Sequence, residues 1–349
     1  MNFLKKIILV LLFLFPISNS FGATLTHVQT VDFDDGDQNQ NRLISGIEFN
    51  KDGTKLFTSS AMATPKVGGT KMNIAEFNLS IPYDISSRTY AGDDERCVMS
   101  EVTVGGTNSV YDLELSHDGT KLFVARRVVS DDADSDDIYR YDLTTPYDIS
   151  TCQFVQETSE LDSIQFLNGS AAGNFSAVGD DYGGDGDIRL QGFEFNNAGT
   201  KLFLSWFGEA DNSAKLLEYT LSTPYDITSL QLVTTAGIDM GTGTTANVIN
   251  SAGIRFSANG KRIFIISHTA NSQGITQISF TNAFDTSSFV MDGKFNLKTA
   301  SPSNLQPRGI SFNSNGLKLY IGNDFNHGAV DQIMEYNLVC PFTIFAETC

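Results

Sequence analysis

Apolar and polar residues alternate along short stretches of the chain, and these stretches come in pairs separated by a turn. One such pair recurs five times, as an apolar strand, a turn that contains glycine, and a second strand that begins near a Lys or Arg. Alternation of this kind around a glycine turn is typical of a β-hairpin in which the glycine takes a positive φ. The five copies are GIEFNKDGTKLF (Gly46–Phe57), DLELSHDGTKLF (Asp112–Phe123), GFEFNNAGTKLF (Gly192–Phe203), GIRFSANGKRIF (Gly253–Phe264) and GISFNSNGLKLY (Gly309–Tyr320).

A second signature follows each hairpin: a strand that ends in an aromatic turn. The turn reads PYDI at Tyr83, Tyr147 and Tyr225, and is looser at Phe284 and Phe342. We expect the proline to end the strand, the ring to pack inward and the Asp to bond nearby backbone N–H groups. Because both signatures recur in every copy, we interpret their residues as structural rather than catalytic.

Four strands per repeat predict the architecture. A strand follows the aromatic turn at 97–104, 152–156, 230–234 and 288–295, and the hairpin glycines lie 66, 80, 61 and 56 residues apart. Four antiparallel strands with this period are typical of a propeller blade. The fifth copy lacks its fourth strand, whereas residues 26–33 form a strand with no partner. We therefore predict an all-β, five-bladed β-propeller whose last blade is closed by the N-terminal strand, which removes two exposed sheet edges.

One long stretch leaves the number of blades open. Residues 157–187 are either an insertion or a degenerate extra blade. The stretch is rich in glycine and lacks a second DGTKLF hairpin, so we favour an insertion.

Composition and the N-terminus limit the class and the compartment. The 349 residues carry 41 Asp and Glu against 23 Lys and Arg, a net charge of -18, which argues against binding nucleic acid through its phosphates. Residues 1–23 contain Lys5, Lys6 and a nine-residue apolar run that is too short to span a bilayer, as in a secretory signal peptide. We expect a single propeller domain at 24–349 that is soluble, monomeric and secreted, either periplasmic or extracellular.

Four cysteines fit an oxidising compartment. Cys340 and Cys349 are close enough in sequence to close a small loop at the end of the chain. Four cysteines allow three connectivities, and the spacing alone leaves the partners of Cys97 and Cys152 open.

The hairpins resemble the repeats of secreted bacterial YVTN-type β-propellers. The segments NKDGTKLF and SHDGTKLFVA carry this resemblance, which covers nearly all of the chain after residue 23 but only within the hairpins. The PYDIS element departs from the YVTN pattern and is similar to an uncharacterised propeller subfamily. The resemblance implies a fold and leaves the function to be argued from a site.

A propeller has two faces, and we expect the acidic residues to gather on one of them. One face carries the connections between blades and those between the second and third strands of each blade, and we call it the loop face. The opposite face carries the uniform turns, and we call it the hairpin face. Acidic segments of the loop face include FDDGDQNQN and GDDYGGDGD, whose alternating carboxylates resemble a calcium loop but lack the glycine and glutamate of an EF-hand. The candidate Ca²⁺ ligands are Asp35, Asp37, Asp181, Asp185 and Asp187; the alternative is an acidic surface that only adds solubility.

The same face offers a candidate ligand site on adjoining blades. An exposed aromatic ring beside carboxylates and imidazoles can stack on a sugar and fix its hydroxyl groups, although the Trp could equally pack between blades. The candidate ligand-binding residues are Trp206, Phe207, Glu209, Asp211, His268, Asp324 and His327.

Acidic residues are also expected in the central channel. Glu48, Glu114 and Glu194 occupy one equivalent position of the first strand in three blades, where Arg255 and Ser311 stand in the other two. Paired carboxylates are what glycoside hydrolysis requires, so the three glutamates and His268 are candidate acid/base catalysts. A polar residue between two buried apolar ones is also what an alternating strand produces without any catalysis.

Two functions are compatible with these patterns, and the sequence does not decide whether the protein is an enzyme. The leading hypothesis is a non-enzymatic propeller that binds a glycan or a surface protein through its acidic loop face, with Ca²⁺ as an ordering ion. The alternative is a hydrolase or lactonase that acts at the same face or at the channel mouth. A structural envelope component is a third possibility.

Overall fold

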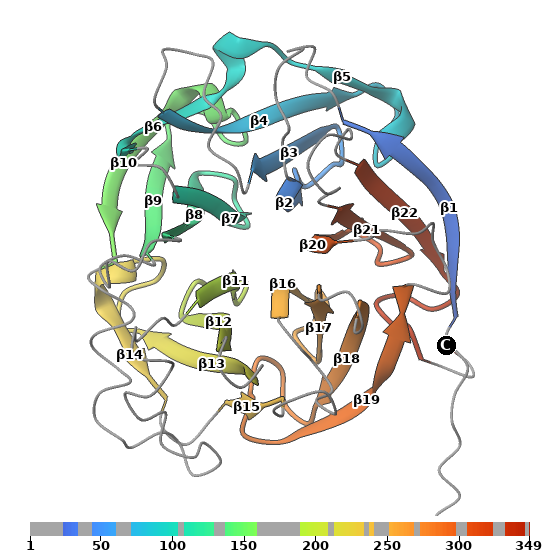
Figure 1. The fold of residues 1–349 in the computed structure, drawn as a ribbon. Helices are drawn as coiled ribbons and strands as arrows, with labels where there is room; N and C mark the ends of the chain where they lie inside the picture. Colours follow the sequence, from blue (N-terminus) through green and yellow to red (C-terminus); the bar gives the residue numbers. More distant parts are fainter. Residues whose placement is uncertain are drawn as a thin grey trace, which may run out of the picture.

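Five antiparallel sheets surround a central axis in a computed structural model of the chain (Figure 1). The structure describes residues 24–33, 44–60, 71–103, 108–128, 137–158, 189–208, 213–233, 237–240, 251–268, 273–297, 306–323, 332–345 and 349. This confirms the predicted five-bladed β-propeller. Among the described residues, no helix has the length and apolar character to cross a membrane.

Each blade runs outward from an inner strand that lines the axis. Blade I contains β2 (Ile44–Phe49), β3 (Lys55–Ser60), β4 (Lys71–Leu79), β5 (Arg88–Tyr90) and β6 (Cys97–Thr103); blade II contains β7 (Asn108–Leu115), β8 (Lys121–Val128), β9 (Asp137–Leu143) and β10 (Cys152–Glu157). Blade III contains β11 (Arg189–Phe195), β12 (Lys201–Gly208), β13 (Ser213–Leu221), β14 (Leu230–Leu232) and β15 (Ile238–Asp239). Blade IV contains β16 (Ser251–Phe256), β17 (Arg262–Ser267), β18 (Gly274–Phe280) and β19 (Phe289–Asn296); blade V contains β20 (Pro307–Phe312), β21 (Lys318–Asn323), β22 (Gln332–Leu338) and β1 (Leu25–Asp32).

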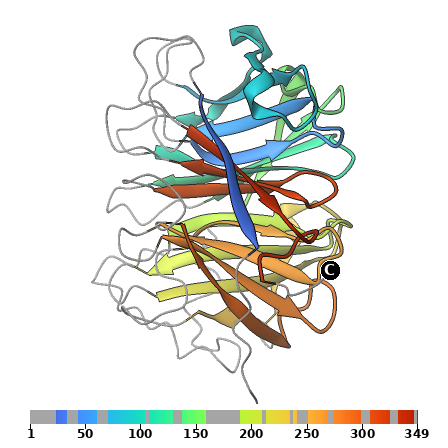
Figure 2. The same cartoon turned by 90° about the vertical axis from the view of Figure 1, so that its right-hand side faces the viewer.

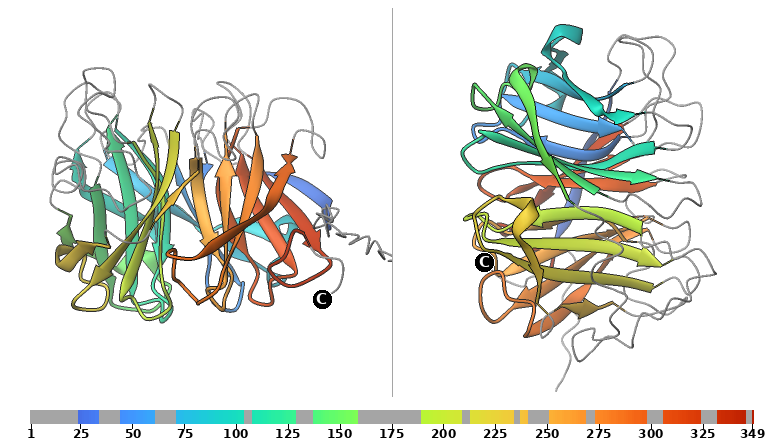
Figure 3. Two further views of the ribbon diagram at one scale, coloured as in Figure 1. Left: turned by 90° about the horizontal axis from the view of Figure 1, so that it is seen from below. Right: turned by 90° about the vertical axis from the view of Figure 1, so that its left-hand side faces the viewer.

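The inner strands contact one another in the order β2, β7, β11, β16, β20 and back to β2. Because β7 and β11 touch directly, residues 157–187 add no blade between them, as expected for an insertion. The hairpins and the short 3-10 turns η1 (Ile85–Ser87), η3 (Ile149–Thr151) and η4 (Ile227–Ser229) lie together at one end of the ring, which is the hairpin face (Figures 2 and 3).

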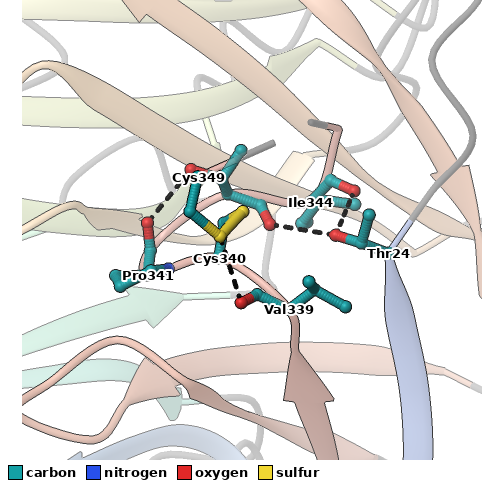
Figure 4. The surroundings of a disulfide bond; sticks show 7 residues. Thr24, Val339, Cys340, Pro341, Ile344 and Cys349 are labelled. Carbon is teal, nitrogen blue, oxygen red and sulfur yellow. Dashed lines mark hydrogen bonds between the residues drawn. A yellow bond between two sulfur atoms is a disulfide. The ribbon is translucent and has the colours of Figure 1, made fainter. Parts of the chain in front are cut away.

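The N-terminal strand closes the last blade as predicted. Strand β1 pairs antiparallel with β22 along its length, from Leu25 opposite Leu338 to Asp32 opposite Gln332. The backbone N–H of Thr24 donates to the carbonyl of Ile344 at 2.8 Å. Ile344 lies in a loop closed by the disulfide Cys340–Cys349, so this disulfide holds the C-terminal segment beside the start of β1 (Figure 4).

The second disulfide joins two neighbouring blades. Cys97 of β6 bonds to Cys152 of β10, which resolves the pairing that the sequence left open. The outer strands of blades I and III differ from the prediction, because each is split into two pieces. In blade I, β5 and β6 pair with different parts of β4 and are separated by a 3-10 turn, η2 (Asp93–Glu95). In blade III, β14 and β15 pair with different parts of β13. Two disulfides are compatible with a secreted or periplasmic protein.

One aromatic ring locks the hairpin of every blade. The residue after proline in PYDI, and its counterparts in blades IV and V, has a positive φ of 48–60°. Its ring lies on the hairpin glycine, where an added Cβ would come within 2.1–2.4 Å of ring atoms. Its N–H donates to the carbonyl of that glycine at 2.8–2.9 Å. The pairs are Tyr83 with Gly53, Tyr147 with Gly119, Tyr225 with Gly199, Phe284 with Gly260, and Phe342 with Gly316.

The first lysine after the hairpin turn connects neighbouring blades. Lys55 of blade I forms an ion pair with buried Glu76 at 2.8 Å and donates to the carbonyl of Tyr147 in blade II. Lys201 does the same with Glu218 and the carbonyl of Phe284. Lys318 pairs with Glu335 and reaches Tyr83. In blade II, Arg140 of β9 reaches the carbonyl of Tyr225 instead.

We predict that Gly119→Ala destabilises the fold by about 2–4 kcal/mol, because the new Cβ combines a left-handed backbone with overlap against the Tyr147 ring. Chemical denaturation followed by circular dichroism measures the loss. The same change made together with Tyr147→Ala is the matched control, since it keeps the positive φ of residue 119 but removes the ring that the new Cβ would meet. An equal loss from Gly119→Ala with and without the ring would contradict the role of the ring.

Candidate functional site

The inner strands approach so closely that glycine is required at the waist of the channel. A Cβ on Gly192 would lie 2.8 Å from the carbonyl of Ala252, and one on Gly253 would lie 2.5 Å from the carbonyl of Arg308. Gly46 and Gly309 show the same proximity to the next inner strand. The glycine that opens four of the five repeats therefore marks the level at which neighbouring inner strands pack backbone against backbone.

In blade II, a residue with a carboxyl group stands at the position of this glycine. Asp112 replaces the glycine, is 2% exposed, and accepts hydrogen bonds from the N–H groups of Leu113 at 2.9 Å and Phe193 at 3.2 Å. Burial raises its pKa to about 7, although Arg255 and the two N–H groups oppose the shift.

A cavity of about 400 Å³ opens from the waist toward the hairpin face. We call it the hairpin-end funnel. Its base is formed by the equivalent inner-strand residues, its walls include four of the five aromatic residues that lock the hairpins, and its rim is formed by the first residue of each hairpin turn. The base consists of Glu48, Glu114, Glu194, Arg255 and Ser311; the walls include Tyr83, Tyr147, Tyr225 and Phe342; the rim consists of Lys51, His117, Asn197, Ala258 and Ser314.

The charged residues at the base hold neighbouring blades together. Glu114 accepts a hydrogen bond from the N–H of Phe195 in blade III, at 2.9 Å from its Oε2. Glu194 accepts one from the N–H of Phe256 in blade IV at 2.5 Å. Arg255 donates through Nε to the carbonyl of Ile310 in blade V at 3.2 Å.

Arg255 is also the cation of the cluster. Its Nη2 lies 2.6 Å from Glu48 Oε2, and its Nη1 lies 3.9 Å from Glu194 Oε1. The four carboxylates around Arg255 raise the pKa of its guanidinium above the usual value, against the effect of burial, so the group stays charged.

The carboxyl groups of the base bind protons more tightly than ordinary glutamates. Burial raises the pKa of Glu194 to about 8, with Arg255 and the N–H of Phe256 opposing the shift. Burial raises the pKa of Glu114 well above its usual value, and the charge of Glu194 adds to the rise. Burial also raises the pKa of Glu48, against the attraction of Arg255. At neutral pH the base therefore contains neutral carboxyl groups beside an ion pair.

The tyrosines of the wall fix the backbone of the rim. The hydroxyl of Tyr83 donates to the carbonyl of Lys51 at 2.8 Å, and that of Tyr147 donates to the carbonyl of His117 at 2.8 Å. Burial raises the pKa of Tyr147 and Tyr225 to about 12, so both hydroxyl groups stay protonated. The rim side chains thus project from a rigid support.

The sequence did not reveal the rim as part of a site. The turns of the hairpin face look uniform, yet the position after the Asn or Ser of each hairpin differs in every blade: Lys51, His117, Asn197, Ala258 and Ser314. Variation at one position inside an otherwise uniform turn was the available signal.

The structure brings together only some of the predicted site residues. Glu48, Glu114 and Glu194 meet in the funnel as expected for channel residues. His268 follows the end of β17, and Ser267 pairs with Ser251 whereas Phe264 pairs with Arg255, so His268 lies toward the opposite end of blade IV. An acid/base pair of His268 with these glutamates is therefore not formed.

The described part of the structure does not test the remaining predicted residues. For Trp206 and Phe207 the structure describes the backbone, in β12, but not the side chains. Glu209, Asp211, Asp324 and His327, and the candidate Ca²⁺ ligands Asp35, Asp37, Asp181, Asp185 and Asp187, lie outside the described residues. Within the described part of the chain, no group of three or more His, Cys, Asp or Glu side chains could hold a metal ion. The Ca²⁺ site stays a prediction.

Comparison with known proteins supports the fold and no closer relationship. No family model and no curated protein sequence matches the chain. Among solved structures, a GH43 β-1,3-galactosidase aligns with a TM-score of 0.53 and 10% identity over 87% of this chain and 93% of that chain. An exo-β-1,3-galactanase from Phanerochaete chrysosporium aligns with a TM-score of 0.51 and 10% identity over 90% of this chain and 64% of that chain.

A periplasmic gluconolactonase from Pseudomonas aeruginosa is similar at a TM-score of 0.44 and 16% identity, over 80% of this chain and 64% of that chain. This chain thus spans just under two thirds of the gluconolactonase and of the galactanase. At these identities the likeness shows a β-propeller fold and nothing more specific.

We predict that the free energy of unfolding falls as the pH rises from 5 to about 8.5. Between its ordinary pKa and about 8, Glu194 binds more protons in the folded than in the unfolded protein, and the same holds for Asp112 up to about 7. The stability that these two groups contribute is therefore complete below this pH window and is lost as the pH rises through it. Urea denaturation across this range measures the slope. Glu194→Gln removes one titrating group and should flatten the slope, whereas Glu95→Gln, an exposed control, should not. A slope that is the same in all three proteins would contradict the assigned pKa values.

Proposed function

We propose that this protein is a non-enzymatic binding propeller that holds a small polar ligand in the hairpin-end funnel. The observation that carries the proposal is the cavity of about 400 Å³, in which acidic, basic and hydroxyl side chains converge at a base surrounded by aromatic walls. A cavity of this size with a few convergent polar groups is the usual form of a small-molecule site.

The hydrogen bonds at the base support binding more than catalysis. Glu114 and Glu194 are each held by a backbone N–H group of the next blade, and Glu48 is held by Arg255. Side chains fixed in this way are arranged to orient a ligand without rearranging themselves, which lowers the entropic cost of binding.

The loop face adds a second proposal, which rests on the sequence. Its acidic segments and Trp206 are the basis for proposing that a glycan or a surface protein binds there and that Ca²⁺ orders the loops. The funnel and the loop face are at opposite ends of the ring, so a partner on the loop face and a small ligand in the funnel would not compete.

We predict that Ser311→Gln abolishes binding in the funnel. Ser311 has Glu or Arg as its counterpart in every other blade, so the backbone accepts a long side chain there, and the added atoms fill the base. Backbone ¹H–¹⁵N spectra of the mature protein, titrated with a panel of sugars, amines and small carboxylic acids, measure binding by shifts at Lys51, His117 and Asn197.

Thr89→Gln is the matched control, because Thr89 is exposed on outer strand β5 and lies far from the funnel base in the sheet. The control should keep the shifts that Ser311→Gln loses. Absence of shifts at the rim with every member of the panel would overturn the proposed binding function.

A hydrolase is the second candidate function, and one observation favours it. Glu114 and Glu194 share a cavity, and the charge of Glu194 raises the pKa of Glu114, so between the two ionisations one carboxyl group is protonated while the other is ionised. This is the combination that general acid and general base catalysis require.

If the protein is a hydrolase, we expect turnover of 4-nitrophenyl β-galactoside or glucono-δ-lactone that falls at least about 100-fold in Glu194→Gln, the usual effect of losing a general acid or base. Release of nitrophenolate and loss of lactone measure the two reactions. Glu95→Gln should retain full activity. Rates equal to the uncatalysed ones in the unaltered protein would exclude these two substrates and favour the binding function.

A further inference from the structure

The base of the funnel has more carboxyl groups than cations. Three carboxyl groups at the base, from Glu48, Glu114 and Glu194, and that of Asp112 at the waist influence a single guanidinium, that of Arg255. All four are largely removed from water by the inner strands. Burying a carboxylate without a cation costs free energy, so such a group either binds a proton or requires a positive charge beside it.

The protein compensates this excess only in part. Arg255 contacts Glu48 at 2.6 Å, but its other terminal nitrogen is 3.9 Å from Glu194 Oε1, which is beyond hydrogen-bonding distance. Glu114 receives one backbone N–H and no cation at ion-pair distance among the described residues. Of the three carboxyl groups at the base, Glu114 and Glu194 are therefore the two that have no cation within hydrogen-bonding distance.

Ser311 gives independent support for a ligand at this level. It is 2% exposed, lines the funnel base, and its hydroxyl makes no hydrogen bond to any described residue. Because this hydroxyl opens into the cavity and is not enclosed by protein atoms, its hydrogen bonds are left for water or a ligand. Its position on β20, the counterpart of Glu48 on β2, turns it toward the same cavity as the carboxyl groups.

The walls favour an organic cation over a metal ion. Tyr83, Tyr147, Tyr225 and Phe342 give the funnel an aromatic lining, which suits the C–H surface of an alkylammonium group and attracts its charge. The described residues include no metal-binding group, and an ammonium group matches separate hydrogen-bond acceptors better than a single coordination centre does.

We propose that the ligand of the hairpin-end funnel is a small organic cation with a primary or secondary ammonium group, which donates hydrogen bonds to Glu114, Glu194 and Ser311. This inference rests on the proposed binding function and specifies the ligand class. The Glu48–Arg255 ion pair stays in place beside the ammonium group.

Binding of such a cation releases protons, because Glu114 and Glu194 must ionise to receive it. Affinity then rises with pH until both are ionised in the free protein. Other titratable groups around the funnel influence the profile and need controls. They are Glu48 and Lys51 of blade I, Asp112 and His117 of blade II, Arg255 of blade IV, and the wall tyrosines Tyr83, Tyr147 and Tyr225.

Isothermal titration calorimetry of the mature protein with 1,4-diaminobutane tests the proposal, with galactose as a neutral probe. We expect diaminobutane to bind at least about tenfold more tightly at pH 8 than at pH 6, as linkage to one carboxyl group with a pKa near 8 requires. Titrations in buffers of different ionisation enthalpy should show that protons are released.

Variants locate the effect in the funnel. Glu194→Gln keeps the size of the side chain and an oxygen for the N–H of Phe256, and should weaken diaminobutane binding at pH 8 by about tenfold or more. Glu114→Gln is a second variant in case the first unfolds. Glu95→Gln makes the same charge change on the exposed turn η2 and should have no effect.

The possible outcomes distinguish the proposed binding function from the proposed ligand class. If galactose shifts the NMR signals of the rim residues and diaminobutane does not bind, the ligand is neutral. The proposed ligand class is then wrong, and the binding function stands. If diaminobutane binds equally well to Glu194→Gln and Ser311→Gln, it binds elsewhere and the proposed ligand class is overturned. If neither probe nor any panel member shifts the rim, the binding function fails together with the cation.

Discussion

Contact between one aromatic ring and one glycine, repeated in every blade, is the constraint on which the hairpin face depends. The ring lies where a Cβ would be, so the glycine cannot be replaced, and the aromatic residue itself takes a backbone conformation that L-residues seldom adopt. The hydrogen bond from its N–H to the glycine carbonyl stabilises that conformation locally. Because the carbonyl of the same residue accepts a hydrogen bond from the previous blade in four of the five blades, one turn fixes both the hairpin and the blade interface.

Charged groups join the blades at two different radii. Further from the axis, Lys55, Lys201 and Lys318 each meet a buried glutamate at 2.6–2.8 Å, and their positive and negative charges balance. At the axis, the carboxyl groups of the inner strands exceed the cations and are held instead by backbone N–H groups. The outer pairs fit a purely structural role, whereas the inner groups combine a structural role with unused capacity for hydrogen bonding. This difference separates the funnel from the other charged positions of the repeat.

Repetition made the fold predictable from the sequence. The hairpins, the blade number and closure by the N-terminal strand all follow from patterns that occur five times or from one missing strand. The split outer strand of blade I was missed because Ala91–Arg96 occurs in one blade only. The pairing Cys97–Cys152 depends on two outer strands being neighbours in the ring, which no local pattern contains. Glu48, Glu114 and Glu194 were found from their equivalent positions, but the funnel around them was not. A cavity depends on how far apart the strands are held, and the rim residues vary inside a turn that otherwise looks like a frame.

Closure of the ring has a consequence for how the chain reaches its folded state. Thr24 bonds to Ile344, and β1 completes a sheet whose other three strands come from the last forty residues or so of the chain. Until those residues are present, β1 has no partner and blade V does not exist, so the first and last blades cannot become neighbours. The ring therefore closes only after β20, β21 and β22 have been synthesised, and closure needs contacts between segments 300 residues or more apart in the sequence, which form slowly. The blades can form earlier, one after another, as an open and curved row.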